Sequence, residues 1–379
     1  MNISLPKRRP RWTFHLLVWA VLAMVGAGSA RASVALLLEM PYGGLGTFNP
    51  TGHSALYFDH ICAATPLQLR PCAPGELGVV ISRYDGIGSF DWVAVPVLPY
   101  LYGVETTAEI PAEMDRLTAL RMRDLYRREH LESVAPDTPE GGMPQGNWYE
   151  LVGSAFDRTL YGFELKTTPQ QDSALINYFN DRPNVTRYSG AFRNCADFAR
   201  IVLDRLYPGA VRRNLIADFG LTTPKSVARG VVHYGRKHPE LELRMFRVPQ
   251  LGGTLPRSMG IQGVTGSLLT RYAVPMAILS PHITAVVVVA YIGRGRFAVP
   301  KNAPVLDLRP REPAPAQGTA VPGTLQSLKA EGTPSAPPIA VPGGELPDGL
   351  LPAWGGAARL TAFHSGVDCD LCDAVPFLP

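Results

Sequence analysis

Cysteine and charged residues are both scarce in this sequence. Of its 379 residues only 5 are cysteine, and 18% are charged. A chain of this length with so few cysteines is not a small disulfide-rich scaffold. The formal charge is +4, but the first 32 residues hold five basic side chains and no acidic one. The remainder is close to neutral, which argues against a nucleic-acid partner.

Several common catalytic and binding motifs are also missing. There is no G-x-S-x-G and no H-E-x-x-H. GGLG at 43–46 lacks the Lys-Ser/Thr of a phosphate loop, and GIGSFDW at 86–92 lacks the third glycine of a dinucleotide-binding turn. We interpret both as turns, and we expect neither a cofactor nor a bound metal.

Glycine and proline are abundant, with 37 and 36 residues, which excludes a tightly helical protein. Between Ser33 and about Gln250, strand-like apolar runs alternate with turn residues, and further runs have helical spacing. The sequence therefore predicts an α+β domain over 33–250. Strands are expected at 34–38, 54–60, 78–84, 91–97 and 241–248, and helices at 112–132, 170–179, 195–206 and 224–234.

Residues 1–32 are typical of a cleaved signal peptide. A basic start is followed by an apolar stretch from Trp12 to Gly26, and Ala30-Arg31-Ala32 supplies the small residues that a signal peptidase needs. An uncleaved anchor or a buried N-terminal helix are the alternatives. We expect an exported protein that works in the periplasm or on the outer face of the cytoplasmic membrane.

A second apolar stretch, 272–292, contains no charged residue and is long enough to cross a membrane. Arg294, Arg296 and Lys301 follow it, as the positive-inside rule requires of a span leaving an exported domain. Alternatively, Ile283 to Ile292 is a core strand that ends at Gly293. We favour a single transmembrane helix at 272–292, after a linker at 251–271 and before a Pro-rich, largely disordered tail at 293–379.

The five cysteines leave one thiol over. Cys62 and Cys72 flank a short Pro-containing loop between predicted strands, which suits a disulfide. Cys369 and Cys372 form an isolated CDLC in the tail, with too few further ligands for a zinc site, and we assign them no function. Cys195 is the leftover thiol.

Cys195 begins a predicted amphipathic helix, with Asn194 as N-cap and Phe198, Val202 and Leu206 on its apolar face. The helix macrodipole and the free N–H groups of the first turn favour a thiolate, so we expect a low pKa and a nucleophilic sulfur. The alternative is a small buried core residue. The candidate base is His53, which opens a predicted strand and shares its face with Ala55 and Tyr57.

GHSALYF at 52–58 and RNCADFA at 193–199 together resemble the circularly permuted papain-like fold of NlpC-type hydrolases and lecithin:retinol acyltransferase-like proteins. The resemblance covers Ser33 to about Pro208. It implies an antiparallel sheet with Cys195 as nucleophile at a helix N-terminus, His53 as base, and a thioester acyl-enzyme. It also implies a third polar residue that orients His53, for which the next strand offers Ser82, Arg83 or Asp85.

The predicted function is that of a membrane-tethered cysteine hydrolase or acyltransferase that acts on an amide or ester in the cell envelope. A peptidoglycan peptide is the favoured substrate and a lipid the second. The alternative, from a different class, is a catalytically silent envelope-binding or structural protein that retains the fold.

Overall fold

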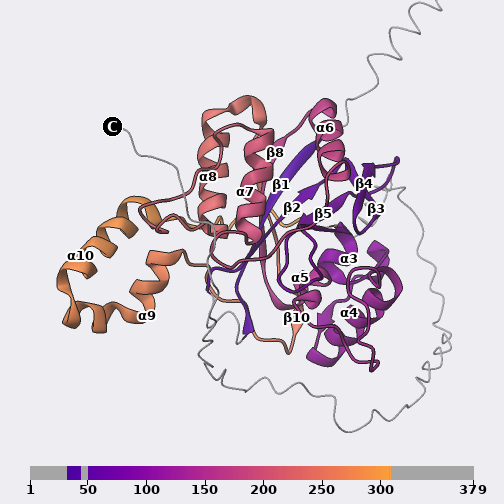
Figure 1. The fold of residues 1–379 in the computed structure, drawn as a ribbon, viewed down its shortest axis with the longest axis horizontal. Coiled ribbons are helices and arrows are strands. Elements are labelled where there is room, and N and C mark those ends of the chain that lie inside the picture. The colour runs from indigo at the N-terminus through magenta and orange to yellow at the C-terminus, as the bar shows by residue number, and fades with distance from the viewer. Residues whose placement is uncertain (1–31, 44–49, 307, 309–379) are drawn as a thin grey trace, which may run out of the picture. The chain divides into compact units, whose positions relative to one another are not determined.

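A six-stranded antiparallel sheet lies at the centre of the domain in the computed structural model, which describes residues 32–43, 50–306 and 308. The strand order is β6-β5-β2-β1-β8-β9. With eight α-helices in the described part, the predicted α+β class is confirmed (Figure 1). The strands of this sheet are β1 (Ser33–Glu39), β2 (His53–Phe58), β5 (Val79–Ser82), β6 (Val93–Pro96), β8 (Leu160–Lys166) and β9 (Arg244–Val248).

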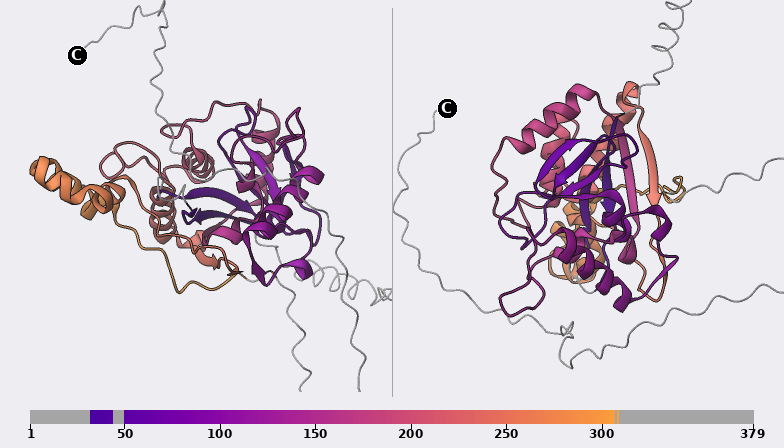
Figure 2. Two further views of the ribbon diagram at one scale, coloured as in Figure 1. Left: turned by 90° about the horizontal axis from the view of Figure 1, so that it is seen from below. Right: turned by 90° about the vertical axis from the view of Figure 1, so that its right-hand side faces the viewer.

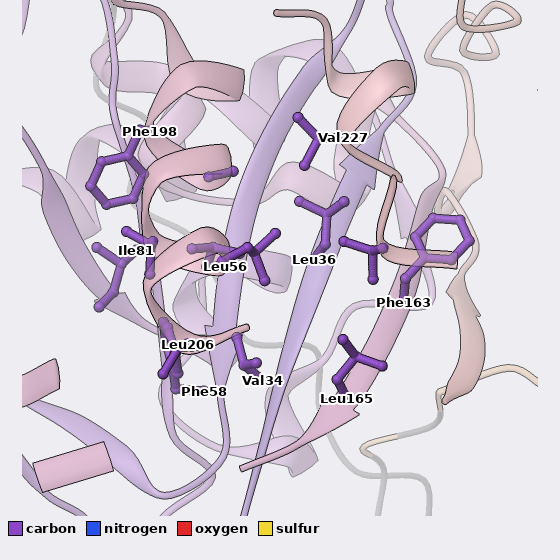
Figure 3. Close-up of a cluster of buried hydrophobic side chains, with 14 of the residues drawn as sticks. Val34, Leu36, Leu56, Phe58, Ile81, Phe163, Leu165, Phe198, Leu206 and Val227 are labelled. Atoms are coloured by element: carbon purple, nitrogen blue, oxygen red, sulfur yellow. The ribbon is translucent and has the colours of Figure 1, made fainter. Parts of the chain in front are cut away.

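The sheet is covered on both faces, which explains why β1 is buried along its whole length and apolar from Val34 to Leu38. Leu36 and Leu38 belong to one apolar cluster, and Ala35 and Leu37 belong to the other. The first cluster packs against helices α7 (Cys195–Leu206) and α8 (Pro224–Lys237), as Figure 3 shows. The second packs against α3 (Val97–Tyr102), α4 (Arg116–His130) and α5 (Ser154–Asp157).

Side-chain caps fix where three of the helices begin. The Asn194 side chain accepts the N–H of Asp197 at the start of α7, as the sequence predicts. Thr168 and Thr223 form capping boxes at the starts of α6 (Pro169–Asn180) and α8, each followed by proline at the first helical position. Asp197, in the first turn of α7, is buried and accepts hydrogen bonds from Arg213 and Thr222.

The predicted Cys62–Cys72 disulfide is present. It joins strands β3 (Ile61–Thr65) and β4 (Gln68–Pro71), which form a separate hairpin. Both the backbone N–H and the carbonyl of Leu69 bond to the side chain of Asn180 at the end of α6. The hairpin is therefore fixed both covalently and by its contact with α6.

Residues 272–292 form neither one long helix nor a strand. They lie in α9 (Val264–Leu279) and α10 (Pro281–Ala290), which meet at Ser280, and in the first two residues of η4 (Tyr291–Gly295). Ser280 ends the first helix and Pro281 begins the second, at the first helical position, where a proline is well accommodated. Pro275 lies inside α9 without ending it. Among the described residues no helix is both long and apolar enough to cross a bilayer. Part of the expected linker, 264–271, is also helical.

Residues after 292 return to the domain. Phe297 and Val299 pack against the core cluster on the α7 face, and Val305 forms a parallel bridge with Arg247 on the edge strand β9. The folded part thus extends beyond the predicted limit near 250. Residues 1–31 of the expected signal peptide at 1–32, the tail from 309 onwards, and Cys369 and Cys372 lie outside the described residues. The remaining elements are β7 (Glu113–Met114), β10 (Gly252–Gly253), η1 (Thr107–Glu109), η2 (Trp148–Leu151), η3 (Pro239–Leu241) and η4 (Tyr291–Gly295).

Candidate functional site

One pocket of about 280 Å³ contains both residues that the sequence singled out. It lies where β2 and α7 begin, so His53 and Cys195 both line it. The Gly52 that precedes His53 has φ +68°, and a Cβ there would collide with the carbonyl oxygen of Glu39. The backbone at this turn therefore requires glycine directly before His53. Other lining residues include Tyr42, Asn147, Glu150, Arg158 and Tyr188.

The Cys195 side chain is a buried thiol at the first turn of α7, with a relative exposure of 6%. Burial raises its pKa to about 11, although hydrogen bonds with the backbone and hydroxyl of Ser54 oppose the shift. The prediction of a low pKa is therefore wrong, because desolvation outweighs the favourable helix terminus. In the resting protein Cys195 is a neutral thiol.

His53 is held by the strand next to its own. Its Nε2 lies 2.9 Å from Oγ of Ser82, and that hydroxyl donates to the carbonyl oxygen of Ser54 at 2.7 Å. Because the hydroxyl proton is already used, Nε2 is the nitrogen that carries the imidazole proton, and Nδ1 keeps a lone pair. The ring also stacks on Tyr84, with centroids 5.1 Å apart. Of the three residues considered for orienting His53, Ser82 is the one that contacts its imidazole.

The His53 imidazole is neutral as well. Burial lowers its pKa well below the usual value, and the nearby positive charge of Arg158 lowers it further. Nδ1 lies 3.5 Å from a carboxylate oxygen of Glu150. Both ring nitrogens therefore face groups other than Cys195, and the two residues share a pocket without forming an ion pair.

The strand geometry accounts for this separation. Ala55 belongs to the cluster under α3 and α5, whereas Leu56 belongs to the cluster under α7. Because side chains alternate along a strand, His53 shares the face of Ala55, and Ser54 shares the face on which α7 packs. Cys195 and His53 thus reach the pocket from opposite faces of β2.

A buried polar network lies beside His53. Arg158 Nη1 is 3.1 Å from Glu39, Nη2 is 3.8 Å from Glu150, and Tyr100 donates a hydrogen bond to Glu39. Burial raises the pKa of Glu39 to about 7, against the opposing effects of Arg158 and Tyr100. Burial also raises the pKa of Glu150, which Arg158 opposes. One buried cation therefore stands between two carboxyl groups that protonate more readily than usual.

Two side chains of this network line the pocket and carry a buried donor without a hydrogen-bond partner in the described part of the chain. These are Arg158, through its Nε, with a side chain that is only 2% exposed, and Tyr42, through its hydroxyl. The guanidinium carbon lies 4.4 Å from the centre of the Tyr42 ring, so the two donors are adjacent. They can bind an oxygen acceptor such as a substrate carbonyl.

Sequence reasoning missed Glu39, Glu150 and Arg158. A sequence signal did exist for Glu39, since it ends the apolar run SVALLLE at a position that alternation assigns to a buried face. The other two candidates for orienting His53, Arg83 and Asp85, have different surroundings. Arg83 pairs with Asp91, and the side chain of Asp85 is exposed.

No metal site is indicated in the described residues. The only group of three potential metal ligands among them is formed by Cys62, Cys72 and Glu76. The two sulfurs of this group are joined in the disulfide. Comparison of the chain with protein-family models, with curated proteins and with solved structures finds no significant match.

Proposed function

We propose that this protein is an exported cysteine-dependent hydrolase or acyltransferase of permuted papain-like fold, acting on an amide or ester carbonyl of the cell envelope. The observation that carries the proposal is the shared pocket, which is lined both by a thiol at a helix N-terminus and by a neutral imidazole whose Nδ1 keeps its lone pair. A peptidoglycan peptide is the favoured substrate, and a lipid acyl ester is the second.

The protonation states favour general-base catalysis. The Sγ of Cys195 attacks the carbonyl carbon while its proton passes to Nδ1 of His53, either after the ring turns from Glu150 or through solvent in the pocket. The imidazolium then protonates the leaving amine or alcohol, which departs and leaves a thioester on Cys195. Water or an acceptor nucleophile gives its proton to the imidazole, attacks the thioester and releases the thiol.

Two groups are placed to stabilise the developing oxyanion. The N–H groups of the first turn of α7 point toward the end of the helix where Cys195 lies. The unpartnered donors of Arg158 and Tyr42 line the same pocket. A carbonyl oxygen bound between these donors brings its carbon into the space beside the sulfur.

The test is trapping of the acyl-enzyme. The folded protein is incubated with a p-nitrophenyl acyl ester and with a muropeptide amide, and intact mass spectrometry follows a hydroxylamine-sensitive acyl adduct on Cys195. We expect Cys195→Ala to abolish the adduct and His53→Gln to slow its formation at least tenfold. His130→Gln is the control, because His130 is a partly exposed histidine on α4. Turnover that survives in Cys195→Ala would refute the nucleophile.

A catalytically silent binding protein is the second candidate. It is favoured by the 6% exposure and raised pKa of Cys195, and by the partners of both His53 nitrogens. In that case no acyl donor forms an adduct on Cys195, but a muropeptide or a lipid still binds in the pocket and covers its lining residues. Binding that is retained in Cys195→Ala, together with no acyl adduct in the unmodified protein, would favour this candidate.

A further inference from the structure

Helices α9 and α10 form an arm that projects from the rest of the described domain (Figures 1 and 2). Large apolar side chains lie exposed along it, with exposed fractions from 59% at Ile283 to 83% at Leu279. Single exposed apolar residues are ordinary, but a contiguous set marks a surface that binds something. Six of these side chains are Val274, Ile278, Leu279, Ile283, Val286 and Val289.

From 272 to 292 the arm is apolar over most of its circumference, and Ser280, His282 and Thr284 are its polar side chains near the tip. From 272 to 292 there is no Asp, Glu, Lys or Arg. Only Thr265 and Gly266 of α9, and Val287 and Ala290 of α10, are buried by the described chain. A helix that is hydrophobic on all sides needs apolar surroundings on all sides. A flat protein partner would cover only one face of it.

At the tip of the arm, the backbone groups of Ser280 are satisfied within the arm itself. The N–H of Ser280 bonds to the carbonyl of Met276 at 2.8 Å. The carbonyl of Ser280 accepts both the N–H and the hydroxyl of Thr284, at 3.1 and 3.0 Å. Pro281 has no N–H to satisfy. At Ser280 and Pro281 the backbone therefore meets the requirement that a bilayer imposes on polar groups in its core.

The dimensions and the flanking charges favour one leaflet of a membrane. The apolar part of α9, Tyr272–Leu279, rises about 12 Å and α10 rises about 15 Å, and half of a hydrocarbon core is also about 15 Å. Arg271, Arg294 and Arg296 are exposed where the arm meets the domain. Guanidinium groups at this depth pair with lipid phosphates. We propose that the arm inserts as a helical hairpin into one leaflet of a phospholipid bilayer.

Insertion of the arm also orients the pocket. Val264 is the first residue of α9 and lines the pocket, and its N–H bonds to Asp218 at 2.8 Å. Thr265 bonds to the carbonyl of Ala217 at 3.1 Å, so the base of the arm is firmly attached. Arg271 lies seven residues beyond Val264, or about 10 Å along the helix. The pocket therefore opens close to the membrane surface.

Photocrosslinking to lipid tests the arm directly in the full chain. The protein is mixed with vesicles of phosphatidylethanolamine and phosphatidylglycerol that contain a diazirine-labelled acyl chain, irradiated and digested with trypsin. Cleavage after Arg271 and Arg294 isolates the peptide 272–294. We expect lipid adducts on this peptide. The triple variant Ile278→Asp/Leu279→Asp/Val286→Asp should reduce them at least tenfold, because these exposed side chains contribute little to the fold.

The matched control is Leu125→Asp, an equally drastic change at a side chain that is 67% exposed on α4. It should leave the adducts unchanged. Vesicle binding through another segment, with no adduct on 272–294, would overturn the proposal. So would a triple variant that turns a dimer into a monomer in gel filtration, because a second copy would then cover the arm. Cys195→Ala should keep the adducts, so this test stands apart from the proposed catalysis.

Discussion

Nε2 of His53 and Oγ of Ser82 lie 2.9 Å apart, and both side chains are buried. The contact joins neighbouring strands β2 and β5 and sets the proton on Nε2. Nδ1 thereby remains the basic nitrogen. The hydroxyl of Ser82 thus serves as a positioning group for the proposed base.

Replacing Ser82 with alanine should therefore impair catalysis more than stability. We expect Ser82→Ala to lower the rate of acyl-enzyme formation about tenfold to a hundredfold, because the wrong tautomer becomes accessible, and to cost about 1 kcal/mol of unfolding free energy. A shifted pH profile of acylation would distinguish a lost orienting contact from a general loss of structure. Ser89→Ala, at an exposed position, is the control and should change neither quantity.

The local features of the site could be predicted from the sequence. Asn194 and the apolar positions after it define where α7 begins, and Gly52 marks the turn before His53. The disulfide follows from a short loop between strands. Each of these depends on residues close together in the chain, where spacing determines geometry.

What could not be predicted depends on contacts between distant segments. Glu39 meets Arg158 near the point where β1 pairs with β8, across more than a hundred residues. No local pattern identifies that partner. The burial of Cys195 by the sheet likewise reverses the pKa shift expected from the helix terminus alone. In 272–292 the apolar run fits a helix or a strand equally well by composition, and Ser280-Pro281 divides it into two helices.

The raised thiol pKa predicts slow alkylation of Cys195. At pH 7 iodoacetamide should modify it much more slowly than it modifies a free thiol in an unfolded peptide, and the rate should keep increasing with pH beyond 9. The measurement is peptide mapping after timed labelling of the native protein. A labelling rate that levels off below pH 8 would show that the thiolate is more stable than its burial implies.

Removing the disulfide should destabilise the protein moderately. Cys62 and Cys72 are ten residues apart, for which loop closure corresponds to about 2–3 kcal/mol. We expect the double variant Cys62→Ser/Cys72→Ser to lose about that much unfolding free energy in urea. The reduced unmodified protein should match it. A variant as stable as the oxidised protein would mean that the contact of Leu69 with Asn180 alone fixes the hairpin.

Arg158 should be among the residues most sensitive to substitution. Its side chain is 2% exposed and balances Glu39 and Glu150, so Arg158→Met leaves two buried carboxyl groups without a cation. We expect a loss of about 3–5 kcal/mol of unfolding free energy at pH 8, measured by urea denaturation. Arg128→Met is the matched control. Although Arg128 pairs with Asp124 and Asp137, it is 49% exposed, so its loss should cost less than about 1 kcal/mol.

The pH dependence of stability should reveal two opposed buried groups. The pKa of Glu39 is raised from 4.5 to about 7, so the folded state holds a proton that the unfolded state releases, and stability falls as pH rises through this window. The pKa of His53 is lowered from 6.5, so the unfolded state binds the extra proton, and stability rises as pH increases toward 6.5.

Between pH 5 and 6.5 the opposite effects of Glu39 and His53 on stability cancel in part. We therefore expect thermal unfolding of Glu39→Gln to show stability that, relative to the unmodified protein, gains with rising pH in this interval. His53→Gln should show stability that falls more steeply than in the unmodified protein, and Glu150 adds a falling contribution to both variants. Parallel curves for the two variants would mean that neither side chain titrates as its burial requires.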